Sequence, residues 1–509
     1  MTDRGRIRRD VPLVAAIAAL ASCAVGPSYR PTASVPPATQ VGAGTTAPAT
    51  RAFFDSLAAA REVDSLTPRD SSGAPISASA AAPAAVVRLR ADSAPDLAWL
   101  DVLRDSTLVG LVRTALAQNR DLQSAAARIR EYRALVGIAR APLFPSVSAN
   151  GTASTNKIAV GAAAPISYDA LRVTGDLAWE LDFWGRTRRG VEAARADLGA
   201  QEANERAILL SLVSDVASGY LQLLELDQER RIAEQTLASR QATLGLARQR
   251  FRQGVISELD VRQFEAQVSA PAATLAQVER QRSQTEHQLN VLLGETPRAI
   301  ALSAAGSLTR AVAALDVPDS LPATLLARRP DMQQAERALA AATARIGVAD
   351  AARLPTISIT VSYGSQARTA SDLFTSRSEV RQLLGGVSVP LFTGGALLNQ
   401  SRAARARAEQ ARAQYEQTTL VALREAGDAL VAARTGRQEV AAQQTQAQAL
   451  RRATQLAELR YRAGIASYIE VLQAQRDLFQ AELALSQAQL GQLNAAVQLY
   501  RALGGSWRR

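Results

Sequence analysis

The sequence has very few of the side chains that most catalytic and metal sites use. Its 509 residues include one cysteine, Cys23, one histidine, His287, and one lysine, Lys157. A structural zinc site needs about four Cys, His or carboxylate ligands, and a nucleophile needs an adjacent base, so we expect no catalytic residues, no metal site and no cofactor. A single cysteine also excludes an intrachain disulfide.

Aromatic residues are scarce too, at 4% of the chain, while 58 Lys+Arg against 47 Asp+Glu give a net charge of +11. A basic chain can bind nucleic acid, but stacking against single strands needs aromatic side chains. The arginines are interspersed with Ala and Glu, as in 403–409, which is typical of a solvated helix face. We therefore expect no nucleic acid partner, and the richness in Ala, Leu, Gln, Arg and Glu predicts long helices.

The first 22 residues have the pattern of an export signal. Several arginines precede the apolar stretch Val11–Ala21, which is too short for a helix that spans a bilayer, since such a helix takes about 20 residues. The stretch ends in Leu20-Ala21-Ser22-Cys23, which resembles a bacterial lipobox, where the cysteine is acylated and becomes the first mature residue. We predict a signal peptide at 1–22 and a covalent lipid on Cys23; the alternative is a buried apolar cysteine after an ordinary signal. Ala24, rather than an aspartate, follows, which by resemblance to bacterial lipoproteins favours the outer membrane.

Residues 23–98 continue from this signal as a lipidated N-terminus and a segment of low complexity. Ala, Ser, Thr and Pro dominate between Pro31 and Pro95, a composition that buries little surface and predicts a flexible tether. Folded structure is expected to begin near Trp99.

The rest of the chain consists of two similar halves at a constant offset of 210 positions. The matched positions are Asn119–Gln123 with Arg329–Gln333, Pro145 with Pro355, Gly185 with Gly395, Gly254 with Gly464, and Gly294 with Gly504. A register held without gaps over this length indicates a duplicated unit. We predict the two copies at 99–300 and 309–509.

Each copy begins with a helix and continues as strands. The apolar spacing predicts a helix that starts after the caps Asp105 and Ser106 and runs through Ile129, with a counterpart at 330–353. After Pro145 and Pro355 the apolar period changes to two. The predicted strands include 147–152, 171–183, 356–363 and 383–391, and polar loops near 156–169 and 365–379 join them in pairs.

Strands of about ten residues that alternate polar and apolar side chains have two explanations. A soluble antiparallel sheet with one wet face gives this pattern, and so does a membrane β-barrel, for which Trp179 and Phe183 would supply interfacial aromatics. The export signal favours the membrane. Because four strands cannot close a barrel and an open edge is not tolerated in hydrocarbon, two, three or four copies of the chain would have to share one barrel.

Long helices make up the remainder. No proline occurs in 187–252 or in 396–509, and some 65 helical residues reach about 100 Å, more than the diameter of a globular domain. The heptad spacing of Leu237, Leu244 and Phe251 is consistent with coiled-coil packing. A kink or a break is expected at Pro271.

Three motifs together carry a resemblance to a known family. They are the lipobox followed by AVGPSYRP at 24–31, WELDFWGR at 179–186 and RAGIASY at 462–468. In these motifs the chain resembles the TolC-like outer membrane factors, in the lipoprotein branch that includes NodT and OprM. The resemblance implies a mainly α fold with a membrane β-barrel contribution: a homotrimer with four strands per protomer, whose twelve-stranded barrel in the outer membrane continues as a long α-helical barrel in the periplasm.

The resemblance also implies a function and partners. Members of the family are exit ducts of tripartite efflux pumps, which work with a periplasmic adaptor protein and an inner-membrane transporter, commonly of the resistance-nodulation-division class. The chain is therefore expected to be a channel and not an enzyme. The alternatives are a type I secretion channel and a lipid-anchored periplasmic coiled-coil scaffold. The sequence does not indicate the exported substrate.

In this family the periplasmic entrance lies at two helix-turn-helix tips, which meet the adaptor and open like an iris. The matching tip residues are Gly254, Ser257, Gly464 and Ser467. The glycines suit the left-handed position that ends a helix. The serines can cap the next helix, with Asp260 and Glu470 three residues later as capping-box acids.

The resemblance assigns gate roles to residues around these tips. The acidic constriction of the family corresponds to Glu470 and, one helical turn later, to Gln473, where relatives often carry an aspartate. Asp260 is a second candidate for a pore-lining acid. Tyr461 matches a tyrosine that helps to hold the closed state, with Arg462 nearby as an ion-pair partner. Helix capping for the acids and plain coiled-coil packing for Tyr461 and Arg462 are the alternative interpretations.

Overall fold

The computed structural model describes residues 24–29, 40–42, 105–158, 166–302, 308–313 and 320–505 of the chain. The predicted signal peptide at 1–22, Cys23, Trp99 and most of the predicted tether lie outside these residues. The chain divides into two compact units, which are described in turn.

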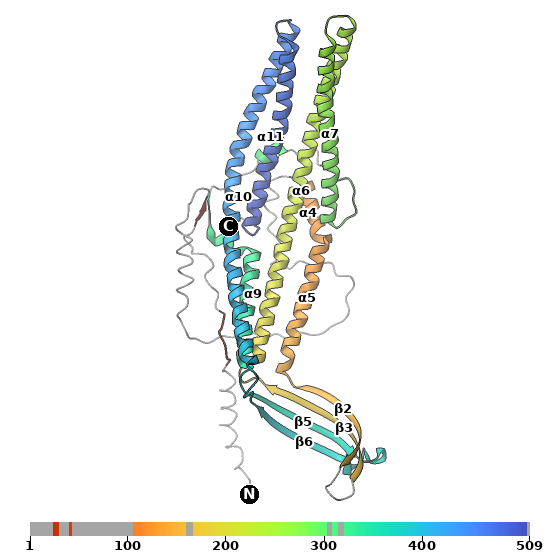
Figure 1. Ribbon diagram of the computed structural model, residues 1–509, viewed down its shortest axis with the longest axis vertical. Coiled ribbons are helices and arrows are strands. Elements are labelled where there is room, and N and C mark those ends of the chain that lie inside the picture. The colour runs from red at the N-terminus through yellow and green to blue at the C-terminus, as the bar shows by residue number, and fades with distance from the viewer. Residues whose placement is uncertain are drawn as a thin grey trace, which may run out of the picture. The chain divides into compact units, whose positions relative to one another are not determined.

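The first unit consists of Met1–Pro31, Ala127–Glu202 and Gln334–Gln417 and contains an antiparallel four-stranded sheet. The strands, in the order in which they pair, are β2 (Ser146–Ile158), β3 (Ile166–Leu181), β5 (Thr356–Ala367) and β6 (Glu379–Ser388), and they lie side by side in Figure 1. This confirms the two predicted strand pairs, one from each half of the repeat. Among the described residues β2 and β6 each pair with one strand only, so both edges of the sheet are bare.

Several of the predicted strand boundaries are wrong. Ile158 pairs with Ile166, so most of the segment 156–169, predicted as a loop, belongs to the strands that flank it. At the other side of the sheet β6 ends at Ser388 and leaves Val389 and Leu391 beyond it. Pro390, which has no N–H to donate to a neighbouring strand, lies two residues after this end.

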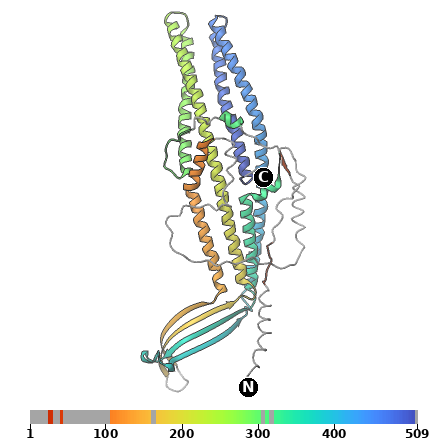
Figure 2. The same cartoon turned by 180° about the vertical axis from the view of Figure 1, so that it is seen from behind.

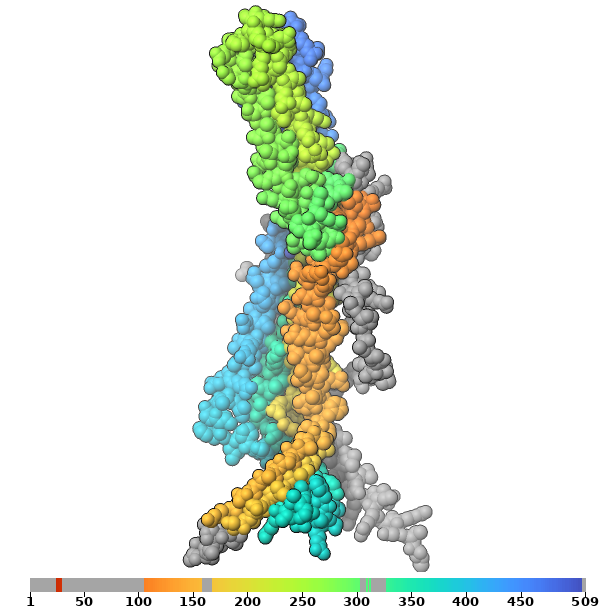
Figure 3. Space-filling model, turned by 90° about the vertical axis from the view of Figure 1, so that its right-hand side faces the viewer, coloured from red at the N-terminus to blue at the C-terminus, as the bar shows by residue number. Residues whose placement is uncertain are grey.

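Polar and apolar side chains alternate between the two faces of the sheet. On one face Leu177, Val361 and Leu383 lie in register across three strands, and Leu383 is 75% exposed. On the other face Asp176 accepts a hydrogen bond from Asn150 at 2.7 Å. No described helix of this unit covers either face (Figures 1 and 2), and the sheet extends beyond the helices of the unit in the space-filling view (Figure 3). An uncovered apolar face is not that of a soluble two-layer fold.

Four helices contribute residues to both units: α5 (Arg120–Arg140), α6 (Arg186–Arg252), α9 (Pro330–Ala351) and α10 (Ala396–Arg462). Helices α6 and α10 have 67 residues each, which confirms the prediction of two helices about 100 Å long. Within the described part of the chain, α6 is the one helix long and apolar enough to cross a membrane. However, 61% of its most apolar window is buried inside the molecule, which is expected of a core helix.

The second unit, Thr32–Ala126, Ala203–Gln333 and Thr418–Arg509, is built on two helical hairpins. One consists of α6 and α7 (Glu258–Leu293), the other of α10 and α11 (Tyr468–Ala502), and both ribbon views show them side by side (Figures 1 and 2). An apolar core around Tyr220 of α6 joins α6, α7 and α11 to α4 (Ser106–Gln118) and α8 (Leu308–Ala313).

Short elements complete the two units. In the second unit β1 (Gln40–Gly42) pairs with β4 (Ser320–Pro322), so the predicted tether joins the fold at this point. The 3₁₀ helices are η2 (Ala141–Leu143), η3 (Ala323–Arg328), η4 (Ala370–Asp372) and η5 (Ser376–Ser378).

The helix predicted from Asp105 through Ile129 is two helices. Asp105 caps α4 as predicted, since its carboxylate accepts a hydrogen bond from the backbone N–H of Thr107 at 2.9 Å. The helix then stops at Asn119, whose ψ of 132° is not helical. The Asn119 side chain accepts from the N–H of Leu122 at 3.0 Å and so caps α5.

Of the kink or break expected at Pro271, the break does not occur. Pro271 lies inside α7, where its ring nitrogen cannot donate to the carbonyl of Gln267 four residues earlier. Arg240 of α6 donates to that carbonyl instead, at 2.8 Å. A buried arginine from the neighbouring helix therefore satisfies the oxygen that the proline leaves without its helical partner.

Candidate functional site at the two hairpin turns

The turn between α6 and α7 is fixed by local hydrogen bonds. Gly254 has a φ of +75°, and the next N–H, that of Val255, donates to the carbonyl of Arg250 at 3.0 Å, which closes α6. Ser257 and Asp260 form the predicted capping box: Asp260 accepts from the N–H of Ser257 at 2.9 Å, and the Ser257 hydroxyl accepts from the N–H of Asp260 at 3.3 Å. Hydrogen bonds from the hydroxyl and the N–H of Ser257 lower the pKa of Asp260. These bonds hold the carboxylate of Asp260 at the start of α7.

The turn between α10 and α11 repeats the first turn without its capping box. Gly464 has a φ of +74°, and the N–H of Ile465 donates to the carbonyl of Arg460 at 2.9 Å. Ser467 lies at the N-cap of α11, but its side chain makes no capping hydrogen bond, so the prediction of a second capping box is wrong. The Glu470 carboxylate is drawn instead toward the guanidinium of Arg460, 3.7 Å away. Glu470 is therefore an exposed acid beside a cation, and not a helix cap.

A cluster of one arginine and three aromatic rings joins the four hairpin helices close to these turns. Arg250 of α6 donates to the Tyr461 hydroxyl of α10 at 2.6 Å and lies 5.7 Å from the centre of its ring. The Tyr461 ring lies 5.1 Å from that of Tyr468 at the start of α11, which lies 4.1 Å from Phe264 of α7. We call Arg250, Tyr461, Tyr468 and Phe264 the hairpin latch. Burial raises the pKa of the Tyr468 hydroxyl, which therefore stays protonated.

Two other candidate residues lie outside the hairpin latch. Arg462 lies 3.9 Å from Glu458, one helical turn earlier on α10, so within this chain its ion pair is with its own helix. Gln473 is exposed on α11, one helical turn after Glu470. Arg250 is the partner that the sequence analysis missed. Its position matches Arg460 in the repeat, but a contact between two hairpins is not visible in spacing along one chain.

The side chains at the turns can form ion pairs and packing contacts. The described residues include no group of three or more His, Cys, Asp or Glu side chains that could hold a metal ion. What the site offers is an exposed ion pair, Arg460 with Glu470, and a cation–aromatic contact that joins the hairpins. Such an arrangement can hold two hairpins together or release them.

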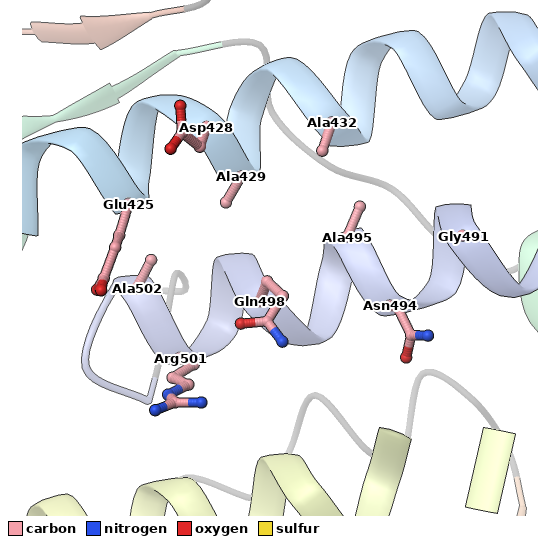
Figure 4. A pocket seen from close by; sticks show the side chains of 10 residues that line it. All are labelled: Glu425, Asp428, Ala429, Ala432, Gly491, Asn494, Ala495, Gln498, Arg501 and Ala502. Carbon is pink, nitrogen blue, oxygen red and sulfur yellow. The ribbon is translucent and has the colours of Figure 1, made fainter. Parts of the chain in front are cut away.

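A groove of about 430 Å³ lies between α10 and α11 in the second unit (Figure 4). Its walls include the small residues Ala429, Ala432, Gly491 and Ala495. Because these side chains are small, a third helix could pack closely against the backbones of α10 and α11. Glu425 at one end is held by Arg329, 2.7 Å away.

The segment 24–29, which follows Cys23 directly, is fastened to the first unit. The N–H of Val25 donates to the carbonyl of Trp184 at 3.0 Å, next to the junction of β3 with α6. The side chain of Arg189 on α6 donates to the carbonyl of Gly26 at 3.0 Å. Gly26 also lies against Gly347 of α9, where an added Cβ would come within 2.4 Å of the Gly347 Cα. The segment therefore holds residue 24 at the strand–helix junction.

Comparisons with known proteins bear on both units. A family model described as "Outer membrane efflux protein" matches residues 111–295 and 321–505, two segments with the same offset as the internal repeat. The probable efflux pump outer membrane protein TtgC of Pseudomonas putida is 35% identical over 421 residues, which cover 82% of this chain and 86% of that protein. The pyoverdine export outer membrane protein OpmQ of the same organism is 34% identical over 433 residues, covering 82% and 90%. The solved structure of the outer-membrane channel OprN has a TM-score of 0.75 at 32% identity and covers 87% of this chain and 99% of that one.

Proposed function

This chain belongs to the outer membrane efflux protein family and is an outer-membrane efflux channel, and we propose that three copies form the exit duct of a tripartite pump. In this proposal the four strands of each copy complete a twelve-stranded barrel, and the hairpins form a helical barrel in the periplasm. The duct receives its substrate from a periplasmic adaptor and an inner-membrane transporter of the resistance-nodulation-division class.

One observation supports a barrel shared between copies more than any other: among the described residues, the sheet has two bare edges and an uncovered apolar face. In hydrocarbon every backbone N–H and C=O must find a partner within the protein, so β2 of one copy has to pair with β6 of the next. The apolar face then contacts lipid, and the face that carries Asp176 and Asn150 lines water. The groove between α10 and α11 gives the neighbouring copy a place to pack its helices.

We propose further that Cys23 carries a covalent lipid and that residues 1–22 are removed. The fastening of Val25 to Trp184 supports this, because it brings the preceding residue to the junction between the sheet and the helices. A lipid at that position would insert beside the barrel. Mass spectrometry of the N-terminal peptide would show the acyl chains; an unmodified Cys23 would disprove the anchor.

The proposed gate lies at the two hairpin turns. The hairpin latch holds the hairpins of one protomer together in the closed state, and the tip residues Gly254, Ser257, Gly464 and Ser467 meet the adaptor. Glu470 with Gln473, and Asp260 from the other hairpin, face the entrance.

Small-molecule efflux is the function we favour over protein secretion. The relatives' names describe pumps for toluene and antibiotics and the export of pyoverdine, all small molecules. Purification of the chain with its adaptor and transporter would identify the pump and narrow the substrate; co-purification with a type I secretion ATPase would contradict this assignment.

Cross-linking between sheet edges tests the trimer. Thr152→Cys on β2 and Gln382→Cys on β6, combined in one chain and treated in membranes with a short bis-maleimide, should give covalent dimers and trimers. Ala178→Cys with Thr360→Cys is the control, because these positions pair inside one sheet and should give only an internal cross-link. A native mass of one chain in detergent, or no product beyond the monomer, would refute the shared barrel.

A further inference from the structure

Two carboxyl groups are buried one helical turn apart on α6, away from the hairpin turns. Glu225 is 2% exposed and Glu229 is 7% exposed. Both face α11 of the other hairpin, where Ser486 is fully buried next to Glu225. Efflux through the channel gives no reason for two buried acids at a contact between helices.

The groups around the two acids are neutral. Gln222 donates to Glu225 at 3.0 Å, and Gln487 of α11 donates to Glu229 at 3.0 Å. Among the described residues, no arginine lies within ion-pair distance of either acid. The hydroxyl of Ser486 faces Glu225 and favours its charged form, but burial outweighs this effect.

Several charged groups on the neighbouring helices form ion pairs of their own. On α6 itself Asp227 holds Arg230 and Arg231 at 3.0 and 2.9 Å. On α7 the buried Glu286 holds Arg282 at 3.0 Å. Helix α8 offers Thr309, which accepts from Gln489 of α11 at 3.3 Å. Arg230, Arg231 and Arg282 therefore form their ion pairs with acids other than Glu225 and Glu229.

Burial in such surroundings penalises the charged form of an acid, and two neighbouring carboxylates penalise each other. Burial first, and then a hydrogen bond and the charge of Glu229, raise the pKa of Glu225 to about 8. At neutral pH Glu225 therefore keeps its proton. Interacting acids of this kind titrate as a pair.

We propose that Glu225 and Glu229 share one proton and form a pH-sensitive contact that holds α11 of the second hairpin against α6 of the first. With the proton present, one carboxyl is a donor and the pair fits the neutral pocket. Loss of the proton places two negative charges in that pocket, and the contact with α11 loosens. The sign follows from the raised pKa: the stabilisation is complete below the ordinary glutamate pKa of about 4.3 and is lost as the pH rises through 8.

The test uses the full-length purified channel in detergent and the isosteric variant Glu225→Gln. Infrared difference spectra between pH 6 and pH 10 should show a protonated carboxyl band that disappears near pH 8 in the wild type and is absent in Glu225→Gln. Glu229→Gln should keep the band but shift its disappearance to lower pH, because the neighbouring charge is gone. Glu234→Gln, an exposed acid on the same helix, should behave as the wild type.

Hydrogen exchange shows whether loss of the proton loosens the contact between α11 and α6. Above pH 8, amide exchange in the segment 486–493 of the wild type, corrected for the intrinsic rate, should increase up to about tenfold for each further pH unit. The same segment in Glu225→Gln should show no such increase. No protonated carboxyl band at pH 7, a band that survives Glu225→Gln, or a midpoint unmoved by Glu229→Gln would overturn the shared proton. Equal alkaline loosening of 486–493 in the wild type and Glu225→Gln would overturn its role in the contact. Both acids and Ser486 belong to one chain, so these outcomes do not depend on the trimer.

Discussion

The hairpin latch makes a quantitative prediction about opening. Tyr461→Phe removes the hydroxyl that Arg250 contacts at 2.6 Å and keeps the ring that lies 5.1 Å from Tyr468. A hydrogen bond from a charged donor is worth about 1.5–3 kcal/mol, and the partial exposure of both side chains favours the lower end. At about 1.4 kcal/mol per factor of ten, the closed state should lose roughly tenfold in population per protomer. If the three copies open together, the loss reaches about a thousandfold.

Planar-bilayer recordings of the purified channel measure this directly as open probability. Arg250→Gln should have an effect close to that of Tyr461→Phe, and the double variant should add little to either, because both single changes remove the same bond. Arg248→Gln is the matched control, since its ion pair with Glu265 at 2.9 Å lies within one hairpin. An increase in opening as large in Arg248→Gln as in Arg250→Gln, or full additivity in the double variant, would refute the reasoning.

Three further predictions concern the turns and the N-terminal segment. Glu470→Gln should raise conductance slightly and mainly at low salt. Its ion pair with Arg460, 3.7 Å away, joins two exposed side chains, so the pair is weak and salt screens it. Recordings at two ionic strengths check this. Amide exchange in 255–260 should rise as the pH falls below about 4. The pKa of Asp260 is lowered in the folded chain, so this carboxylate stabilises the turn above the ordinary carboxyl pKa, and the stabilisation is lost in acid. Asp260→Asn should abolish this pH dependence. Gly26→Ala should make the segment 24–29 sensitive to proteolysis, because the new Cβ would lie 2.4 Å from the backbone of Gly347. Gly137→Ala is the control: its new Cβ would have no atom within 4 Å, so the segment should stay protected. Equal protease sensitivity of the two glycine variants would contradict the close contact.

The features that the sequence predicts well are those with a local signal. Period-two alternation identified all four long strands, the absence of proline identified the two 67-residue helices, and Gly254 and Gly464 identified both turns. The Ser257–Asp260 capping box was predictable because both partners lie within one helical turn.

The features that the sequence did not predict depend on partners far along the chain. The continuity of α7 at Pro271 depends on Arg240, which lies on another helix. The hydroxyl of Tyr461 accepts a hydrogen bond from Arg250, which lies 211 positions away and which no local pattern indicates. In the second turn, spacing alone could not show that Arg460 would draw Glu470 away from Ser467.

The bare edges of β2 and β6 also predict how a defective copy would affect intact copies in the same cell. A copy whose β6 edge is blocked, for instance by a proline at Gln382, could still bind a neighbour through β2 and then prevent the ring from closing. In the proposed trimer one such copy disables two intact ones. A cell that expresses equal amounts of both forms would then keep about one working channel in eight, so the defect would be dominant.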